Sequence, residues 1–286
     1  FYKELEETIP KIYVKVSSDK QISTIYKSYL KDQMLLKDFY YSLIILLTKQ
    51  YKIEEDKIIK LLKKKDLIIY KFLKENRGRN YNRKYKFLNS QIKKCILSSY
   101  NKKIKNYLDV GCLDGKKKDI YCLNLESDKT FIGGKQSKNI IFKTYNGIEN
   151  FPLEDNFFSL ITYDSVLHHV ENIDHVLKET HRILRKGGLL LVREHDARTD
   201  FDKMLCDISH INFRYLPFES QKASLRGEEI IDIKDIEQTG NYISWLELNY
   251  IITSHNFTLK NHIKDPIYKN ELNNVTRTYY SLYQKI

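Results

Sequence analysis

The sequence is poor in cysteine, with four among 286 residues, at positions 95, 112, 122 and 206. These cysteines form no Cys-x-x-Cys pair and have no histidine at zinc-ligand spacing, so the sequence predicts neither a disulfide framework nor a structural zinc. Such sparing use of cysteine is typical of a reducing, intracellular compartment. Long apolar runs are absent too, since the longest, at 42–47 and 189–192, fall far short of the ~20 residues that span a bilayer. The sequence predicts a globular protein without a membrane span.

A signal-peptide pattern is also missing, and the first residue is Phe1 rather than methionine. We therefore expect the chain to be a piece of a larger protein. Lysine, by contrast, is abundant, and the formal net charge is +12. Residues 1–105 carry 26 Lys and Arg against 11 Asp and Glu, a net +15, whereas residues 106–286 carry 23 against 26, a net −3. This placement indicates either an arm that binds a polyanion or a solvated lysine-rich surface, and charge alone favours neither.

Proline and glycine are absent from residues 20–75, where apolar residues recur every three or four positions. This rhythm predicts amphipathic helices. The polar residues 74–85 are expected to form a linker or a loop that faces a substrate, and residues 86–100 to be helical again. We accordingly predict a basic helical N-terminal extension, or a linker from an upstream domain, over residues 1–85 and a second domain from 86 to 286.

From residue 106 onward the chain alternates short β-like runs with helical runs. This alternation predicts an α/β fold with a mostly parallel sheet, which an antiparallel strand at 276–285 would close. The other expected strands are 106–111, 130–134, 140–145, 158–163 and 189–194, and the expected helices follow Gly115 and cover 171–185 and 244–257, with a turn at 186–188.

Two segments carry recognisable chemistry. "LDVGCLDG" (108–115) ends the first strand in a glycine-containing turn, and such a turn at the carboxyl end of a parallel strand accepts a ligand. Residues 151–192 contain "FPLEDNFFSLI", "VLHHV" and "LKETHRILRKGG". In these motifs the chain resembles the class I S-adenosylmethionine-dependent methyltransferases, best over residues 100–200. The resemblance implies a Rossmann-like methyltransferase fold and S-adenosylmethionine as the cofactor.

The resemblance also implies which residues hold the cofactor. Its methionine part is expected over Asp109, Gly111 and Gly115. The family's acidic residue after the second strand, which holds the ribose, is replaced in "FIGGK" by Lys135, followed by Gln136. This leaves three alternatives. Gln136 supplies the hydrogen bonds to the ribose, or the protein binds the cofactor weakly, or the chain is a degenerate relative that does not catalyse methyl transfer. The expected cofactor contacts are Lys93, Asp109, Gly111, Gly115, Gln136 and Asp164, with Tyr145, Asn146 and Gly147 near the adenine.

Further stretches point to the methyl acceptor. "FLNSQIKKCIL" resembles a helix of the mRNA cap guanine N-7 methyltransferases, in which an asparagine approaches the cap phosphates and a lysine one turn later approaches the cofactor. Asn89 and Lys93 have that spacing. The same resemblance aligns His168 of "VLHHV" with a histidine that contacts the cap. It also implies that Tyr279 or Tyr280 of "TYYSLYQK" lines the guanine pocket, and we assign this role to Tyr280. Each stretch also has a simpler explanation. The first can be an ordinary amphipathic helix, "VLHHV" is common among methyltransferases of many substrates, and the tyrosine can be a core aromatic.

The cap enzymes read guanine with an acidic residue, and Asn241 falls at that position. Glu194, within "REHDARTDFDK" at the end of the fifth strand, is a candidate replacement, because a carboxylate can accept hydrogen bonds from guanine N1–H and its amino group. A catalytic triad or a metal site in that cluster is less expected, since neighbouring residues of a strand alternate between faces. Ion pairs among these charged residues at the edge of the sheet explain the cluster about as well as a role in binding guanine does.

Together these resemblances imply an mRNA cap guanine N-7 methyltransferase with capped RNA as its partner and no metal. The capping enzymes of large DNA viruses of the African swine fever virus type are the family implied, which suggests a larger multidomain enzyme in the cytoplasm, viral factory or virion. Guanine N-7 has a lone pair and needs no general base, so alignment would supply the catalysis, with the cap positioned by Asn89, His168, Glu194 and Tyr280. The open alternatives are a tRNA or small-molecule methyltransferase and an inactive RNA-binding stimulatory module.

Overall fold

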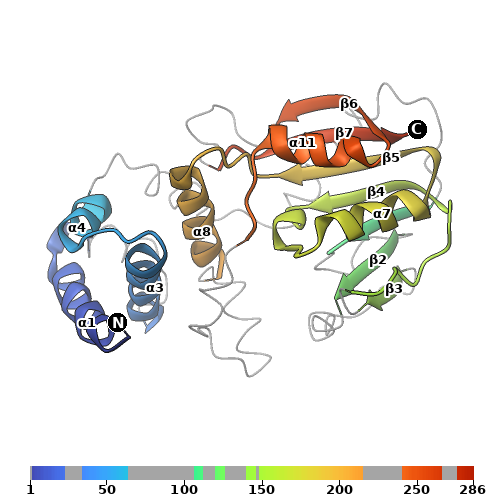
Figure 1. Ribbon diagram of the computed structural model, residues 1–286. Coiled ribbons are helices and arrows are strands. Elements are labelled where there is room, and N and C mark those ends of the chain that lie inside the picture. The colour runs from blue at the N-terminus through green and yellow to red at the C-terminus, as the bar shows by residue number, and fades with distance from the viewer. Residues whose placement is uncertain are drawn as a thin grey trace. The chain divides into compact units, whose positions relative to one another are not determined.

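The computed structural model describes residues 2–22, 34–63, 106–111, 120–125, 140–145, 148–214, 240–265 and 276–286. The chain divides into two compact units, whose elements are labelled in Figure 1. The first unit comprises residues 1–81, 199–240 and 268–276, and the second comprises residues 82–198, 241–267 and 277–286. Within the described ranges no helix combines the length and the apolar character that crossing a bilayer requires.

The first unit is helical in its described part. The predicted helices within residues 20–75 are confirmed for 34–50 and 55–63, whereas α1 lies before that stretch and contains Pro10. Proline removes one backbone donor from a helix, which the burial of neighbouring apolar residues offsets here. The helices are α1 (Tyr2–Ser18), α3 (Met34–Ile45), the π-helical turn η1 (Leu46–Gln50), α4 (Glu55–Lys63) and α8 (Asp200–Arg214).

One apolar cluster holds these helices together. In α1 it includes Ile9, Ile12 and Val16, and residues of α3 and α4 join them. Helix α8 contributes Met204 and Ile208, one turn apart, to the same cluster. Although residues 86–286 were predicted as one domain, α8 therefore belongs to the core of the N-terminal helices.

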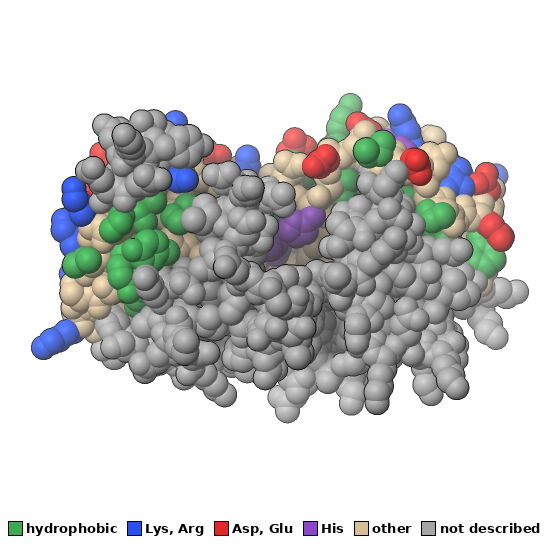
Figure 2. All heavy atoms as spheres, turned by 90° about the horizontal axis from the view of Figure 1, so that it is seen from below, with side chains coloured by type: hydrophobic (Ala, Val, Ile, Leu, Met, Phe, Trp, Pro, Cys, Tyr) green, Lys and Arg blue, Asp and Glu red, His purple; other side chains and the backbone are tan. Residues whose placement is uncertain are grey.

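Lys and Arg side chains stand out from the described surface of the first unit (Figure 2). Part of this charge is neutralised locally, since Lys63 pairs with Asp19 at 2.6 Å and Lys57 with Glu54 at 2.8 Å. Residues 1–63 carry 12 basic against 9 acidic residues, whereas residues 64–105 carry 14 against 2. The strongest basic segment of the chain thus lies outside the described residues, and the predicted polyanion-binding arm stays a prediction.

The second unit is built on a sheet whose described strands have the order β3-β2-β1-β4-β5-β7-β6. All neighbouring pairs from β3 to β5 are parallel, and β7 runs antiparallel to both β5 and β6. The predicted parallel sheet with an antiparallel closing strand is therefore confirmed. The strands are β1 (Tyr107–Val110), β2 (Ile120–Leu125), β3 (Ile140–Tyr145), β4 (Phe158–Asp164), β5 (Leu184–Glu194), β6 (Phe257–Lys264) and β7 (Tyr279–Lys285).

Two helices, α7 (Ile173–Ile183) and α11 (Trp245–Ser254), cover the same face of this sheet (Figure 1). Their buried residues, such as Leu177 and Ile252, join one core cluster with alternate strand residues, among them Ile161, Leu190 and Val192. Since alternate residues of a strand share a face, the strands present one apolar row to the helices and a second row to the opposite side. The predicted helices 171–185 and 244–257 are confirmed with shorter bounds.

Three details differ from the sequence predictions. The strand next to β1 is β2 at 120–125, whereas the strand expected at 130–134 lies outside the described residues. The predicted turn at 186–188 belongs to β5, which accommodates it with Gly187 in the left-handed region at a φ of +70°. The strand β6 was not predicted, and it pairs with β7 along the edge of the sheet.

Candidate active site at the carboxyl ends of the strands

The turn after β1 lies at the switch point of the sheet, where the chain leaves toward β2 and β3 and later returns as β4 on the other side of β1. Gly111 begins this turn with a φ of +70°, which favours glycine. A β-carbon there would lie 2.6 Å from Cγ2 of Val166, in the loop after β4. Asp109 is buried, and its Oδ1 accepts a hydrogen bond of 2.6 Å from the Thr162 hydroxyl. Open parallel sheets bind ligands at this point.

Strand β4 ends in a loop fixed by Arg193 of β5. Ser165 has a φ of +59°, and its amide donates to the Arg193 carbonyl at 2.8 Å. The Arg193 guanidinium donates to Asp164 Oδ1 at 2.9 Å and to the Ser165 hydroxyl at 2.7 Å, and it also pairs with the buried Asp265 at 2.9 Å. Asp164, a predicted cofactor contact, is thereby held at the end of β4 with its side chain partly exposed.

The short 3-10 turn η4 (Leu167–His169) follows this loop and brings His168 against Glu194, the last residue of β5. His168 Nδ1 lies 2.6 Å from Glu194 Oε2, and the Leu167 amide donates to Glu194 Oε1 at 2.7 Å. The two side chains are only 3% and 4% exposed. Glu194 thus contacts His168 through one carboxylate oxygen and accepts from the Leu167 amide through the other.

Three further contacts hold His168 in place, two at its imidazole and one at its backbone carbonyl. The Tyr242 ring stacks on it with 5.2 Å between centroids and 28° between planes. The Asn241 amide donates to the His168 carbonyl at 2.6 Å. The His195 ring lies 5.2 Å away. A side chain restrained from so many directions is pre-organised for a functional role.

A cavity of about 120 Å³ opens beside this pair. Its polar lining includes His168, Glu194 and Asn241, and its apolar wall comes from the η4 turn, the start of α7 and one side of α11, with Ile173 and Leu248. Few polar groups converging in an apolar cavity are typical of a site for a small ligand or a ring. The structure thus brings together three positions at which the sequence places cap contacts.

The face on which each tyrosine lies corrects one predicted contact. In the β5–β7 ladder Tyr279 stands opposite Glu194, and Tyr280 opposite Arg193. Directly opposite residues share a face of a sheet, so Tyr280 lies on the other face from Glu194 and packs with Leu191. The assignment of Tyr280 to the pocket of His168 is therefore wrong, and Tyr279 is the tyrosine on that face.

Tyr279 is buried, and its hydroxyl has no hydrogen-bond partner among the residues that the structure describes. Burial, and then the negative charge of Glu194, raise the pKa of the Tyr279 phenol far above its usual value. The hydroxyl is therefore protonated at neutral pH.

Two expectations about the "REH" segment also change. Glu194 was expected to accept hydrogen bonds from guanine, but its carboxylate is engaged by His168 and the Leu167 amide. Glu194 and His195 were expected on opposite faces, yet both lie against His168. The reason is that β5 ends at Glu194, so His195 is beyond the strand and is no longer bound by its alternation.

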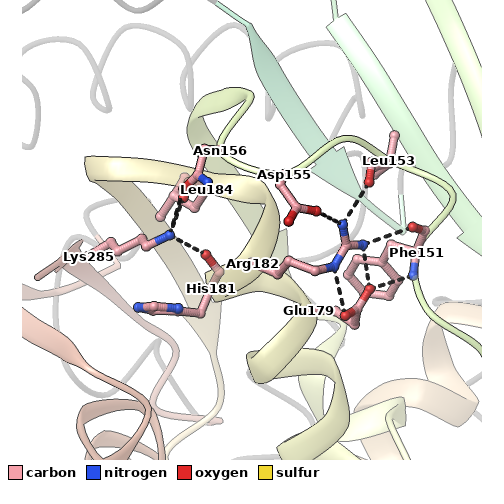
Figure 3. Close-up of polar contacts among 9 residues, drawn as sticks. All are labelled: Phe151, Leu153, Asp155, Asn156, Glu179, His181, Arg182, Leu184 and Lys285. Carbon is pink, nitrogen blue, oxygen red and sulfur yellow. Dashed lines mark hydrogen bonds and ion pairs between the residues drawn. The ribbon is translucent and has the colours of Figure 1, made fainter.

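The motif "LKETHRIL" holds the chain before β4 in place (Figure 3). Arg182 donates to the carbonyls of Leu153 and Phe151 at 2.9 and 3.0 Å and to Glu179 at 2.9 and 2.6 Å, and it also pairs with Asp155. Glu179 in turn accepts from the Phe151 amide at 2.7 Å. The motif is thus structural, and it anchors residues 151–155 rather than a ligand.

Several predicted contacts cannot be placed. Tyr145 is described only as the last residue of β3. The contacts outside the described residues are Asn89, Lys93, Gly115, Gln136, Asn146 and Gly147.

The bounds of β2 change which residue follows the second strand of the sheet. Strand β2 pairs with β1, with Cys122 opposite Asp109, and ends at Leu125. The next residue in the sequence is Glu126, an acidic residue, whereas the prediction placed Lys135 at this point. The missed signal was "IYCLNLE" (120–126), a short β-like run followed directly by an acid.

Residues 108–192 match the family model described as a methyltransferase domain. Together with the strand order, this match identifies a Rossmann-like, class I S-adenosylmethionine-dependent methyltransferase domain, whose cofactor is S-adenosylmethionine. No curated protein matches the chain.

Similar solved structures include S-adenosylmethionine-dependent methyltransferases from Thermotoga maritima (15% identity, TM-score 0.45, covering 72% of this chain and 97% of that one) and Methanosarcina mazei (15%, 0.42, 67% and 97%). A protein from Pyrococcus horikoshii is 16% identical, with a TM-score of 0.48 and coverage of 73% and 93%. At TM-scores below 0.5 none of these likenesses bears on the methyl acceptor.

The described residues fit this cofactor. Gly111 allows the left-handed turn at the end of β1, at the point where open parallel sheets bind their ligands. Asp109 places a buried carboxylate at the end of the same strand. These residues would hold S-adenosylmethionine, which supplies a methyl group on a positively charged sulfur when it is bound.

Proposed function

We propose that the chain is an mRNA cap guanine N-7 methyltransferase, which transfers a methyl group from S-adenosylmethionine to the 5′ cap of RNA. One observation carries this proposal. The cavity at the carboxyl ends of β4 and β5 is lined by His168 and Asn241, at which the sequence resemblance places cap contacts, and by Glu194, which contacts His168. A cavity with an apolar wall and a few polar groups on one side suits a purine ring.

The basic N-terminal segment supports an RNA substrate. Residues 64–105 carry 14 basic residues against 2 acidic ones, and each phosphate that such a segment neutralises releases a counterion and strengthens binding. In this proposal Asn89 and the neighbouring basic residues hold the triphosphate, and Lys93 approaches the cofactor carboxylate. The chain is then part of a larger viral capping enzyme of the cytoplasm.

Glu126 removes the main objection to cofactor binding. The family's ribose acid follows the second strand, and Glu126 follows β2 directly. We therefore assign ribose recognition to Glu126 in place of Gln136. A normal ribose contact argues against a scaffold that has lost its cofactor and its catalysis.

Methyl transfer to defined RNAs tests the proposal. The full chain is incubated with S-adenosylmethionine labelled in its methyl group and with three RNAs, namely RNA with a GpppA cap, the same RNA with a 5′ triphosphate, and a transfer RNA. Only the capped RNA is expected to be labelled, and nuclease digestion with mass spectrometry should identify 7-methylguanosine. Label on transfer RNA alone would show the tRNA methyltransferase instead.

Calorimetry with S-adenosylhomocysteine separates the remaining alternatives. Binding without transfer to any RNA would indicate a small-molecule acceptor, whereas RNA binding without affinity for S-adenosylhomocysteine would indicate a stimulatory module. The Glu126→Gln variant is expected to bind S-adenosylhomocysteine about ten- to a hundredfold more weakly, because it loses a charge-assisted hydrogen bond worth about 1.5–3 kcal/mol. Lys135→Gln is the matched control and should bind as the wild type does.

A further inference from the structure

Two exposed polar side chains line the cavity beside η4. Glu171 lies two residues after that turn, and Asn241 lies in the segment that leads into α11. Among the residues that the structure describes, neither the Glu171 carboxylate nor the Asn241 carboxamide has a hydrogen-bond or ion-pair partner. Both side chains can therefore bind a ligand without first breaking a contact within the protein.

The turn between these two residues is held firmly in place. The Leu167 amide donates to Glu194 Oε1 at 2.7 Å, which ties the start of the turn to the end of β5. The Asn241 amide donates to the His168 carbonyl at 2.6 Å, which ties the second segment to the same turn. The backbones that carry Glu171 and Asn241 are thus anchored together at one cavity. Groups on an anchored backbone lose less freedom when a ligand binds, so they contribute more to its affinity.

A carboxylate beside a carboxamide distinguishes the nucleobases by their edges. A carboxylate only accepts hydrogen bonds, whereas a carboxamide both donates and accepts. Guanine offers two neighbouring donors, N1–H and the 2-amino group, next to the acceptor O6. Adenine and cytosine offer one amino group beside a ring nitrogen that accepts, and uracil offers one N–H between two carbonyls. Each of these three bases would place an acceptor against the carboxylate, so the pair suits guanine.

We infer that Glu171 and Asn241 determine the specificity of the site for guanine. The Glu171 carboxylate accepts hydrogen bonds from N1–H and the 2-amino group, and the Asn241 carboxamide donates to O6. The ring lies against the apolar wall that Ile173 and Leu248 form. N-7 belongs to the five-membered ring, away from N1 and the 2-amino group, so it stays open to the methyl donor. This inference rests on the proposed cap acceptor, and it gives the contact with guanine to Glu171 in place of Glu194, whose carboxylate is already engaged.

A cycle between enzyme and substrate tests the contact with Glu171. The wild-type chain and Glu171→Ala are assayed for kcat/KM on RNA capped with guanosine and on RNA capped with inosine, which lacks only the 2-amino group. The wild type is expected to prefer guanosine about ten- to a hundredfold, because inosine leaves one charge-assisted hydrogen bond unmade. Glu171→Ala should methylate both caps equally slowly. If this variant keeps the preference of the wild type, the carboxylate does not contact the 2-amino group and the inference is overturned.

Glu247→Ala is the matched control for this cycle. Glu247 is an exposed acid on α11 that does not line the cavity. The variant should methylate both caps as the wild type does, and a lost preference for guanosine in this control would show that surface charge, not contact, explains the effect of Glu171→Ala.

Asn241→Asp tests the contact with O6. The change keeps the shape of the side chain but replaces its donor by a charged acceptor. Because both caps carry O6, kcat/KM should fall about ten- to a hundredfold on each of them, while the preference for guanosine remains. A rise in kcat/KM would show that an acid at position 241 reads the base, and it would overturn the division of roles between Glu171 and Asn241.

Calorimetry with cap dinucleotides gives a readout without turnover. In the presence of S-adenosylhomocysteine the wild type should bind GpppA about ten- to a hundredfold more tightly than IpppA, and Glu171→Ala should bind both equally. Unchanged affinity for S-adenosylhomocysteine shows that each variant is folded. Transfer to neither cap by the wild type would refute the cap acceptor and this inference with it. Equal rates of the wild type on the two caps would leave guanine N-7 as the acceptor and refute the role of Glu171 alone.

Discussion

The backbone of Gly111 lies directly against the side chain of Val166, so the turn after β1 and the loop after β4 share one contact. A β-carbon at position 111 would stand 2.6 Å from Val166 Cγ2 on a backbone with a φ of +70°. Gly111→Ala is therefore expected to lower the free energy of unfolding by about 2–5 kcal/mol, from about 1–2 kcal/mol of left-handed strain and about 1–3 kcal/mol of overpacking. Affinity for S-adenosylhomocysteine should fall as well.

Gly187 provides the control for this substitution. It has the same φ of +70°, but a β-carbon there would meet only Gln284 Nε2 at 3.7 Å, an ordinary contact. Gly187→Ala should cost only the backbone strain, about 1–2 kcal/mol, and leave cofactor affinity unchanged. Urea unfolding and calorimetry measure both quantities, and equal effects of the two substitutions would show that the Val166 contact does not matter.

Strong local patterns made most of the sheet predictable. The strands at 107–110, 140–145 and 158–164 are apolar runs bounded by polar or turn residues, and those signals are local. Strand β2 was missed because "TFIGG" shows a β-like pattern as clear as that of "IYCLNL", and only pairing with β1 decides between them. Helix α8 was missed because its partners are the N-terminal helices, far away in the sequence.

The site was predictable as a location and less so in its contacts. The glycine turn and the histidine after β4 are local motifs, and both lie at the carboxyl edge of the sheet. The face of Tyr280 was not predictable, because a shift of one residue in the β5–β7 register moves every side chain to the other face. The role of Glu194 depends on His168, which folding brings to it from 26 residues away.

Arg182 is the centre of one of the two groups of contacts drawn in Figure 3, the other lying around Lys285. Lysine cannot reproduce its fork of donors to Glu179 and to the carbonyls of Phe151 and Leu153. Arg182→Lys is expected to lower the free energy of unfolding by about 2–4 kcal/mol, because it leaves buried acceptors without a partner. Lys178→Ala, an exposed change on the same helix, should cost less than about 0.5 kcal/mol. Similar unfolding midpoints for the two variants would contradict this role of Arg182.

Glu179 should make stability depend on pH in the acidic range. Burial alone would raise its pKa, but the hydrogen bonds from Arg182 and the Phe151 amide outweigh burial and hold the pKa below its ordinary value of 4.5. A carboxyl whose pKa is lowered by folding stabilises the protein fully above its unfolded pKa, and that contribution is lost as the pH falls through the folded pKa. The stability difference between wild type and Glu179→Gln should thus be largest at neutral pH and shrink below pH 4.5. Denaturant unfolding at a series of pH values measures it, and a constant difference would contradict the assignment.

Removing the hydroxyl of Tyr279 should not destabilise the protein. Among the described residues this buried hydroxyl has no hydrogen-bond partner, and a buried polar group without a partner costs about 1–3 kcal/mol. Tyr279→Phe is therefore expected to leave the free energy of unfolding unchanged or to raise it by about 1 kcal/mol. Tyr163→Phe is the matched control, since the equally buried Tyr163 hydroxyl lies 2.6 Å from the Thr180 hydroxyl, which itself donates to Val176. That variant should lose about 1 kcal/mol, and urea unfolding that ranks the two tyrosines in the opposite order would show that Tyr279 has a partner in the folded protein.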